Sequence, residues 1–154
     1  MLSNYQLINY TECTEEQQKE IFILRNLYDI RKWMVNQEPI KWEDHLRFIE
    51  NLRHTSDRKY FAIYKNKDLI GTYNLTKESD FTWERGIITS PKYHGTGITS
   101  EMEKWVLDSL PKDEFKTITA KVKLDNIRSI KYHEKIGYKE TYRSNEFIYY
   151  KLTL

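Results

Sequence analysis

The chain has 154 residues, of which 31% are charged and 39% hydrophobic, the balance of a globular protein with one buried core. Its net charge is +2 with both signs interspersed, so we expect neither a nucleic-acid nor a membrane partner. The single Cys13 cannot form an internal disulfide, the N-terminus lacks the pattern of a signal peptide, and no segment approaches the ~20 apolar residues of a membrane span. We therefore expect one domain, residues 1–154, in the cytoplasm.

The N-terminal part predicts a strand followed by helices. Residues 5–10, YQLINY, alternate weakly and suit a strand. Thr14 and Gln17 have the spacing of a capping box, in which the Thr hydroxyl accepts a helix-start N–H and the Gln amide reaches back. Residues 29–54 are typical of one or two further helical pieces interrupted near Pro39. Three of their apolar residues would face a core: Leu46, Ile49 and Leu52.

The hydrophobic period changes from helical to alternating at Lys59. Residues 59–66 and 69–77, with a turn at 66–68 between them, predict a hairpin rich in β-branched and aromatic residues. Residues 81–90, FTWERGIITS, continue as a third antiparallel strand.

Helices and strands alternate in the C-terminal part. The sequence predicts a helix from Gly97 to Leu110, a strand over residues 116–124 and a short helix over residues 126–137. Two strands close the chain as a second hairpin: residues 138–143 and 146–154. This order predicts an α/β (α+β) fold with a mixed sheet and helices on both faces.

The corner KYHGTGITS, residues 92–100, places Gly95 and Gly97 at the start of a helix, although the chain has only five glycines. A dinucleotide fingerprint would need a third glycine where Ser100 stands, and a P-loop would need Gly-Lys-Ser/Thr. Glycines before a helix can expose backbone N–H groups to a phosphate, or they can only supply positive φ in a turn. The corner by itself leaves both interpretations open.

Two motifs resemble the GCN5-related N-acetyltransferases over essentially the whole chain. Lys92-x-x-Gly95-x-Gly97 is similar to the family's Arg/Gln-x-x-Gly-x-Gly/Ala, with Lys92 as the one departure. The segment NIRSIKYHEKIGY, residues 126–138, is similar to the family's Asn-x-x-Ala-x-x-Leu-Tyr-Glu-Lys-x-Gly-Phe.

This resemblance implies a single domain with a mixed, mostly antiparallel sheet of about seven strands flanked by helices. It implies acetyl-CoA as co-substrate, with its pyrophosphate on the glycine corner, and no metal. The cofactor-binding residues implied are Ile87, Ile88, Thr89, Lys92, Tyr93, His94, Gly95, Thr96, Gly97, Ile98, Asn126 and Tyr132.

Acetyl transfer to an amine needs a base for the amine and a donor for the developing oxyanion. In several members of the family an acidic residue at the place of Glu84 is the base; the alternative is a strand carboxylate paired with Arg85 or Lys121. The resemblance also implies that the strand holding Ile87 and Ile88 separates from its neighbour and offers backbone N–H groups to the cofactor.

His133 stands where many members of the family have the tyrosine that protonates the leaving thiolate. A neutral imidazole carries one N–H and titrates near ~6.5, so it can replace the tyrosine hydroxyl as an acid. Alternatively, His133 only packs near the cofactor, and both interpretations stay open. Its neighbour Tyr132 cannot take over directly, because adjacent helical residues point ~100° apart. The other histidines show no metal-ligand spacing.

The N-terminal half resembles the sugar-nucleotide N-acetyltransferases of the pseudaminic-acid pathway, which acetylate the 4-amino group of a UDP-linked 4-amino-4,6-dideoxy sugar. Four residues match positions that contact the nucleotide there: Arg25, His45, Thr76 and Lys77. Lys121 and Glu84 depart from that pattern, which leaves the acceptor sugar and the place of the base open.

Two other functions fit the same motifs. One is an acetyltransferase for ribosomal proteins, protein N-termini or polyamines. The other is a coenzyme A-binding module without catalysis, which the missing tyrosine makes conceivable. A homodimer paired through strand edges near the C-terminal hairpin is a further hypothesis.

Overall fold

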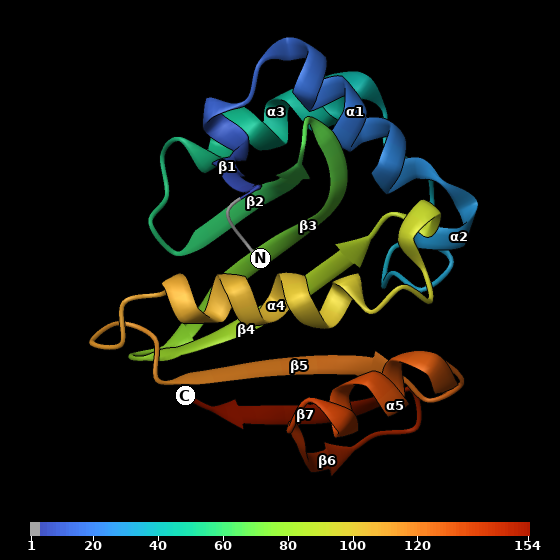
Figure 1. The fold of residues 1–154 in the computed structure, drawn as a ribbon, viewed down its shortest axis with the longest axis vertical. Coiled ribbons are helices and arrows are strands. Elements are labelled where there is room, and N and C mark those ends of the chain that lie inside the picture. The colour runs from blue at the N-terminus through green and yellow to red at the C-terminus, as the bar shows by residue number, and fades with distance from the viewer. Residues whose placement is uncertain (1–3) are drawn as a thin grey trace.

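A computed structural model describes residues 4–154, which form seven strands and five α-helices (Figure 1). The strands are β1 (Tyr5–Asn9), β2 (Arg58–Lys65), β3 (Asp68–Ser79), β4 (Thr82–Thr89), β5 (Thr117–Lys123), β6 (Lys139–Arg143) and β7 (Phe147–Thr153). The helices are α1 (Glu15–Asn26), α2 (Tyr28–Arg31), α3 (Trp42–Leu52), α4 (Ile98–Ser109) and α5 (Ile127–Lys135). Short 3-10 turns cover Tyr10–Glu12 and Pro91–Tyr93.

The strands form one sheet in the order β1-β2-β3-β4-β5-β7-β6. Every neighbouring pair is antiparallel except β4 and β5, which are parallel. The predicted fold class and its seven-stranded, mostly antiparallel sheet are therefore confirmed. The C-terminal hairpin is also confirmed, with β7 lying inside the sheet and β6 at its edge, where all five residues of β6 are exposed.

Local sequence signals explain where several elements begin and turn. The capping box at the start of α1 is confirmed: Gln17 N–H donates to the Thr14 hydroxyl at 3.1 Å, and Thr14 N–H donates to the Gln17 side chain at 2.9 Å. Asn66 and Lys67 form the predicted turn between β2 and β3, both with positive φ, 51° and 69°. Such two-residue turns match the twist of the flanking strands.

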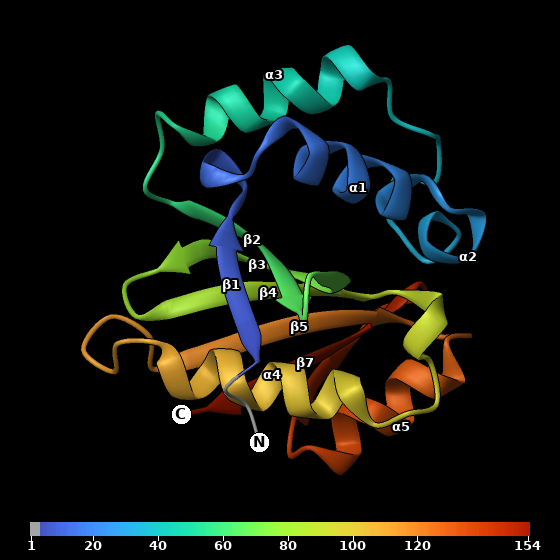
Figure 2. The same ribbon diagram turned by 45° about the horizontal axis from the view of Figure 1, so that its top comes forward.

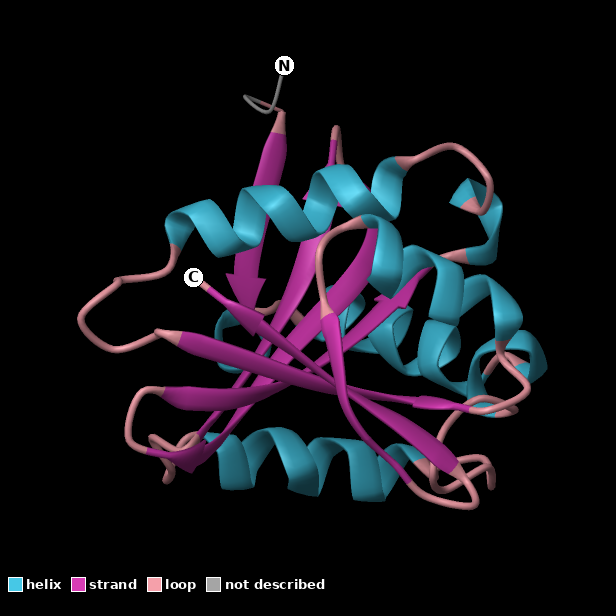
Figure 3. Cartoon of the chain, turned by 90° about the horizontal axis from the view of Figure 1, so that it is seen from below, coloured by secondary structure: helices cyan, strands magenta, loops and turns pink. Residues whose placement is uncertain are grey.

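Helices cover both faces of the twisted sheet (Figures 2 and 3). On one face, Ile21 of α1 and Ile49 of α3 pack on Ala62 and Tyr64 of β2. Leu46 is 39% exposed, so the prediction that it faces the core is wrong. The buried residues of α3 are His45, Ile49 and Leu52, so His45 faces the core in place of Leu46.

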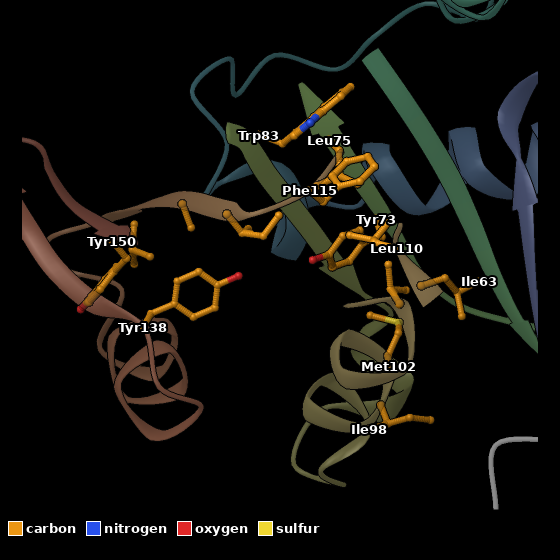
Figure 4. Packing of buried hydrophobic residues seen from close by; sticks show 14 of the residues in the cluster. Ile63, Tyr73, Leu75, Trp83, Ile98, Met102, Leu110, Phe115, Tyr138 and Tyr150 are labelled. Carbon is orange, nitrogen blue, oxygen red and sulfur yellow. The ribbon is translucent and has the colours of Figure 1, made fainter. Parts of the chain in front are cut away.

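The larger core lies on the opposite face, under α4 and α5. Met102 and Val106 of α4 are fully buried against strand residues that include Tyr73 and Trp83. Figure 4 shows this cluster, with the hydroxyls of Tyr73 of β3 and Tyr138, between α5 and β6, pointing toward one another. Among residues 4–154, no helix combines the length and the apolar character needed to cross a membrane.

Candidate active site

The glycine corner connects the end of β4 to the start of α4. Gly95 and Gly97 have φ of 79° and 82°, and a Cβ added at either position would meet nothing within 4 Å. The first helical hydrogen bond of α4 runs from Glu101 N–H to the Gly97 carbonyl. The N–H groups of the turn before Glu101 therefore have no carbonyl of the helix to donate to. Within the corner, Thr96 N–H donates to the Tyr93 carbonyl and Ile98 N–H to the Thr96 hydroxyl. The corner therefore combines open space, two residues without side chains and the positive end of a helix dipole, which together suit a phosphate group.

Side chains inside the corner hold its shape. The hydroxyls of Thr89 and Thr99 are 2.7 Å apart and join the end of β4 to the first turn of α4. His94 places Nε2 3.1 Å from the Thr89 carbonyl, and the Thr96 hydroxyl donates to the Tyr93 carbonyl at 2.6 Å. These bonds leave the space above the two glycines clear.

The corner is also anchored to the turn between β2 and β3. Asp68 accepts a hydrogen bond from Lys92 Nζ at 2.9 Å and another from the Tyr93 hydroxyl on the same oxygen. The Tyr93 hydroxyl first, and Lys92 after it, lower the pKa of the Asp68 carboxyl. Lys92, the one departure from the family's loop motif, is thus held by a carboxylate of another element.

β4 and β5 separate soon after they meet. Their pairing is limited to Thr82–Glu84 of β4 against Thr117–Thr119 of β5, whereas β4 continues to Thr89 paired with β3 alone. The expected separation of the strands is confirmed. Because successive strand residues direct N–H groups to opposite edges, one of Ile87 and Ile88 offers its N–H to the gap.

Glu84 lies on the sheet face away from α4. Its partner across the β3–β4 ladder is Thr76, and Lys77 lies opposite Trp83. Glu84 forms no ion pair within residues 4–154, because Arg85 binds Glu103 instead and Lys121 lies 5.3 Å over the ring of Phe147.

Tyr60 of β2 lies near both Glu84 and the C-terminal end of α1. Thr76 of β3 lies opposite Arg58 of β2 on one side and opposite Glu84 of β4 on the other, and Tyr60 is two residues after Arg58. Burial raises the pKa of Tyr60, whereas the charges of Arg58 and Arg25 lower it and that of Glu84 raises it. The structure therefore brings Arg25, Thr76 and Glu84 to one region of the sheet around Tyr60. Lys77 lies further along β3, 3.9 Å from Asp80.

Arg25 occupies the last turn of α1 with part of its guanidinium unsatisfied. Nη2 donates to the Asn36 carbonyl at 3.3 Å, whereas the buried Nη1 has no partner among residues 4–154. Burial lowers the pKa of Arg25, although arginine stays protonated in proteins. A buried donor that carries charge and lacks an acceptor is a candidate contact for an anionic group.

His45 lies between α1 and α3 instead of in this region. It is 4% exposed, its Nε2 is 3.0 Å from the Gln18 carbonyl, and its ring packs against Phe22 and Trp42. Burial lowers the pKa of His45, so its neutral form is favoured. None of these contacts joins it to Arg25, Thr76 or Lys77.

His133 of α5 is 2% exposed and has both ring nitrogens occupied. Nδ1 lies 2.7 Å from the Ser129 carbonyl and Nε2 lies 3.0 Å from Arg85 Nη1. Because the guanidinium can only donate, Nε2 accepts and Nδ1 carries the proton. Burial, with Arg85 second, lowers the pKa of His133 to about 4. This geometry favours packing over the role of acid, since no N–H is left for a thiolate.

Two further residues predicted to bind the cofactor, Asn126 and Tyr132, lie at the start of α5 and where α5 contacts α4. Asn126 caps the helix, its side chain accepting from Ser129 N–H at 3.3 Å. The Tyr132 hydroxyl lies 2.8 Å from Glu103 Oε1 and 3.2 Å from the Thr99 carbonyl, both on α4.

A buried ion pair beneath this site was not expected from the sequence. Arg85 binds Glu103 through two bonds, Nε to Oε2 at 2.7 Å and Nη2 to Oε1 at 2.8 Å. The sequence offers one signal, because Arg85 lies two residues after Trp83 and so shares its strand face. For Glu103 the helical spacing offers no such signal. Residues 4–154 contain no cluster of three or more potential His, Cys, Asp or Glu metal ligands.

Comparison with known proteins agrees with this geometry. Residues 27–138 match the acetyltransferase (GNAT) family. The chain is 32% identical over 130 residues to the acetyltransferase PseH of Campylobacter jejuni, an alignment that covers 83% of this chain and 80% of that protein.

Two solved structures share the fold. The crystal structure of C. jejuni PseH in complex with acetyl coenzyme A has a TM-score of 0.75 at 24% identity, covering 97% of this chain and 98% of that one. Spermidine N-acetyltransferase from Vibrio cholerae, in complex with CoA and spermine, has a TM-score of 0.82 at 20% identity, covering 98% and 96%. The resemblance read from the two sequence motifs is confirmed, and the chain belongs to the acetyltransferase (GNAT) family.

Proposed function

We propose that the chain transfers the acetyl group of acetyl-CoA to the primary amine of an acceptor that also carries negative charge. The acceptor we propose is a UDP-linked 4-amino-4,6-dideoxy sugar, acetylated on its 4-amino group. The observation that carries this choice is Arg25, whose buried Nη1 has no acceptor among the described residues. A diphosphate would supply that acceptor, because guanidinium groups bind phosphate oxygens through charged hydrogen bonds.

The charge of Arg25 also argues against a polyamine. A polyamine is a chain of cations, and placing one beside a partly buried guanidinium would add repulsion between like charges. The likeness to spermidine N-acetyltransferase, at 20% identity, is one of fold alone and is no argument for the acceptor. Thr76 and Lys77 would complete contacts to the sugar nucleotide, whereas we propose that His45 supports them from between α1 and α3.

The corner fits acetyl-CoA because its glycines leave open space at positive φ beside first-turn amides. Residues 87–89 and 92–98 would hold the cofactor from β4 and the corner, with Asn126 and Tyr132 shaping the opposite wall. Acetyl-CoA supplies, when bound, the thioester carbonyl that the amine attacks. The unpaired N–H of Ile87 or Ile88 would donate to the carbonyl oxygen as negative charge develops there.

Glu84 is the proposed base. It lies in the same region as Arg25 and forms no ion pair within residues 4–154, so its carboxylate can accept the proton of the attacking amine. His133 has no free N–H for the leaving thiolate, and we propose that it positions Arg85 instead. The cytoplasmic location and the homodimer stay predictions.

A panel of acceptors tests the proposal. Wild-type protein with acetyl-CoA would be offered UDP-4-amino sugars, peptides with free N-termini and spermidine, and release of free thiol would be followed. We expect turnover with UDP-amino sugars. Turnover only with peptides or spermidine would overturn the acceptor, and binding of acetyl-CoA without turnover of any amine would indicate a non-catalytic module.

A further inference from the structure

We infer that Glu103 is a positioning residue that fixes α4, α5 and β4 to one another around the cofactor cleft. This inference rests on the proposed use of acetyl-CoA. The Glu103 side chain is 2% exposed on α4, yet both of its oxygens are bonded. Its donors are Arg85 Nε and Nη2 and the hydroxyls of Tyr73, Tyr132 and Tyr138, at 2.7–2.9 Å.

These five bonds saturate the carboxylate and keep it charged. A carboxylate offers about four lone-pair directions, so five donors leave none free. Burial alone would raise the pKa of Glu103, but Arg85 and the tyrosine hydroxyls outweigh burial and lower it. Glu103 therefore carries no proton in the reaction, and its contribution is geometric.

The donors come from elements that surround the cleft. Arg85 is the first residue of β4 beyond its pairing with β5, so its ion pair holds β4 against α4 where the strands separate. Tyr132 joins α5 to α4, because its one hydroxyl hydrogen can donate to Glu103 Oε1 at 2.8 Å, with the Thr99 carbonyl as a second acceptor at 3.2 Å. Thr99 belongs to the first turn of α4, directly after the glycine corner. One carboxylate thus sets the spacing of the strand and the two helices that frame the cofactor.

His133 extends the same network along α5. Its Nε2 accepts from Arg85 Nη1, and its ring stacks on Tyr150 of β7 at 5.2 Å between centroids. The position at which the family has a hydroxyl donor is therefore used here to hold the guanidinium that binds Glu103.

Glu103→Gln is the obvious test, but it leaves Arg85 buried without its counter-charge and can unfold the protein. The decisive comparison uses Tyr132→Phe and Tyr73→Phe, which each remove one hydroxyl donor to Glu103. Tyr132 connects α5 to α4, whereas Tyr73 connects β3 to α4 and takes no part in the contact between the two helices. Tyr73→Phe is thus the matched control for loss of a buried hydrogen bond.

Binding of CoA to each purified protein would be measured by titration calorimetry, and amide exchange of the first α4 turn by mass spectrometry. We expect Tyr132→Phe to raise the Kd of CoA at least about five-fold and to speed that exchange, as loss of one hydrogen bond allows. Tyr73→Phe should change the Kd less than about two-fold, whatever its melting temperature. Equal effects in both variants, or none in either, would overturn the inference. A raised Kd in Tyr132→Phe without faster exchange would also overturn it, because it would indicate a direct contact of Tyr132 with the cofactor. Failure of wild-type protein to bind CoA would instead overturn the proposed function.

Discussion

Arg85 and Glu103 form a two-point ion pair inside the protein, with N–O distances of 2.7 and 2.8 Å. Their side chains are 3% and 2% exposed, so water does not screen the pair. A buried pair of this kind adds little net stability over apolar residues, but each charge depends on the other. Its retention in the core fits the positioning role inferred for Glu103.

The two charges should therefore show strong coupling in a double-mutant cycle. We expect Arg85→Met and Glu103→Leu each to lower the free energy of unfolding by about 3–5 kcal/mol, because each leaves a buried, unpaired charge. The double variant should lose much less than the sum of the two. Urea denaturation at 25 °C measures all four proteins, and additive losses would contradict the coupling.

Gly97→Ala separates the conformational role of the corner from its binding role. Alanine at φ of 82° should lower the free energy of unfolding by about 1–2 kcal/mol. It should also weaken CoA binding, because its Cβ enters the open space above the corner. Gly137→Ala is the control: it has φ of 103° and its Cβ would meet only Leu152, at 3.8 Å. Both variants should lose stability, and unchanged CoA affinity in Gly97→Ala, measured by calorimetry, would exclude the phosphate site.

Glu84→Gln removes the proposed base while keeping the size of the side chain. We expect kcat to fall about 10²–10⁴-fold, the usual contribution of a general base, with the Kd of CoA unchanged. Thiol release and calorimetry measure the two quantities. Glu146→Gln, an exposed carboxylate before β7, serves as the control and should turn over normally. Wild-type turnover in Glu84→Gln would require a different base.

Arg25→Lys tests the negative charge of the acceptor. Lysine keeps the charge but loses the planar fork, so we expect KM for a UDP-amino sugar to rise about ten-fold, equivalent to ~1.4 kcal/mol. KM for acetyl-CoA should not change. Arg53→Lys, directly after the last residue of α3, is the control; it alters an arginine bound to Glu50 and the Thr11 carbonyl. Equal KM values in wild type and Arg25→Lys would remove the reason for an anionic acceptor.

His133 should make stability depend on pH. Burial, followed by Arg85, lowers the pKa of His133 from 6.5 to about 4 in the folded protein. Between these values the unfolded chain binds more protons, so the free energy of unfolding rises with pH. The stabilising contribution of neutral His133 to the free energy of unfolding is complete above pH ~6.5 and is lost as pH falls toward ~4. Its size is on the order of 3 kcal/mol.

Urea denaturation of wild type and His133→Gln at two pH values, one above and one within this window, measures the effect. Glutamine can donate to the Ser129 carbonyl and accept from Arg85, so the variant should fold while losing the His133 part of the pH dependence. His45 contributes with the same sign in both proteins. An unchanged pH dependence in the variant would contradict the assignment. Loss of turnover in folded His133→Gln would instead indicate that His133 protonates the leaving thiolate.

Sequence patterns predicted the elements whose signals are local. The capping box of Thr14, the turn at Asn66 and the helix start at Gly97 depend on residues within one turn of each other, and all three are confirmed. The two family motifs then identified the fold, because they occur in order on the predicted elements.

The parts that failed depend on packing between elements. Leu46 was expected in the core because it is apolar, but α3 turns His45 inward and leaves Leu46 at the surface. The sequence analysis assigned no role to Glu103, and its partner Arg85 lies on a different element, β4. Neither outcome can be read from helical spacing alone, because each depends on which face of the helix the sheet covers.

The short pairing between β4 and β5 also bears on how the protein assembles during synthesis. Strands β1–β4 lie within residues 5–89 and pair with one another completely, so they can form before the rest of the chain is made. Strands β5–β7 then join through only three residue pairs of the described sheet, Thr82–Glu84 with Thr117–Thr119. Contacts such as the Trp83 ring against Phe115, 4.7 Å between centroids, must therefore secure this late docking step. Because β4 separates from β5 at the proposed cofactor site, the two parts of the sheet share few backbone hydrogen bonds. We therefore expect side-chain packing to contribute more than backbone pairing when β5–β7 join β1–β4.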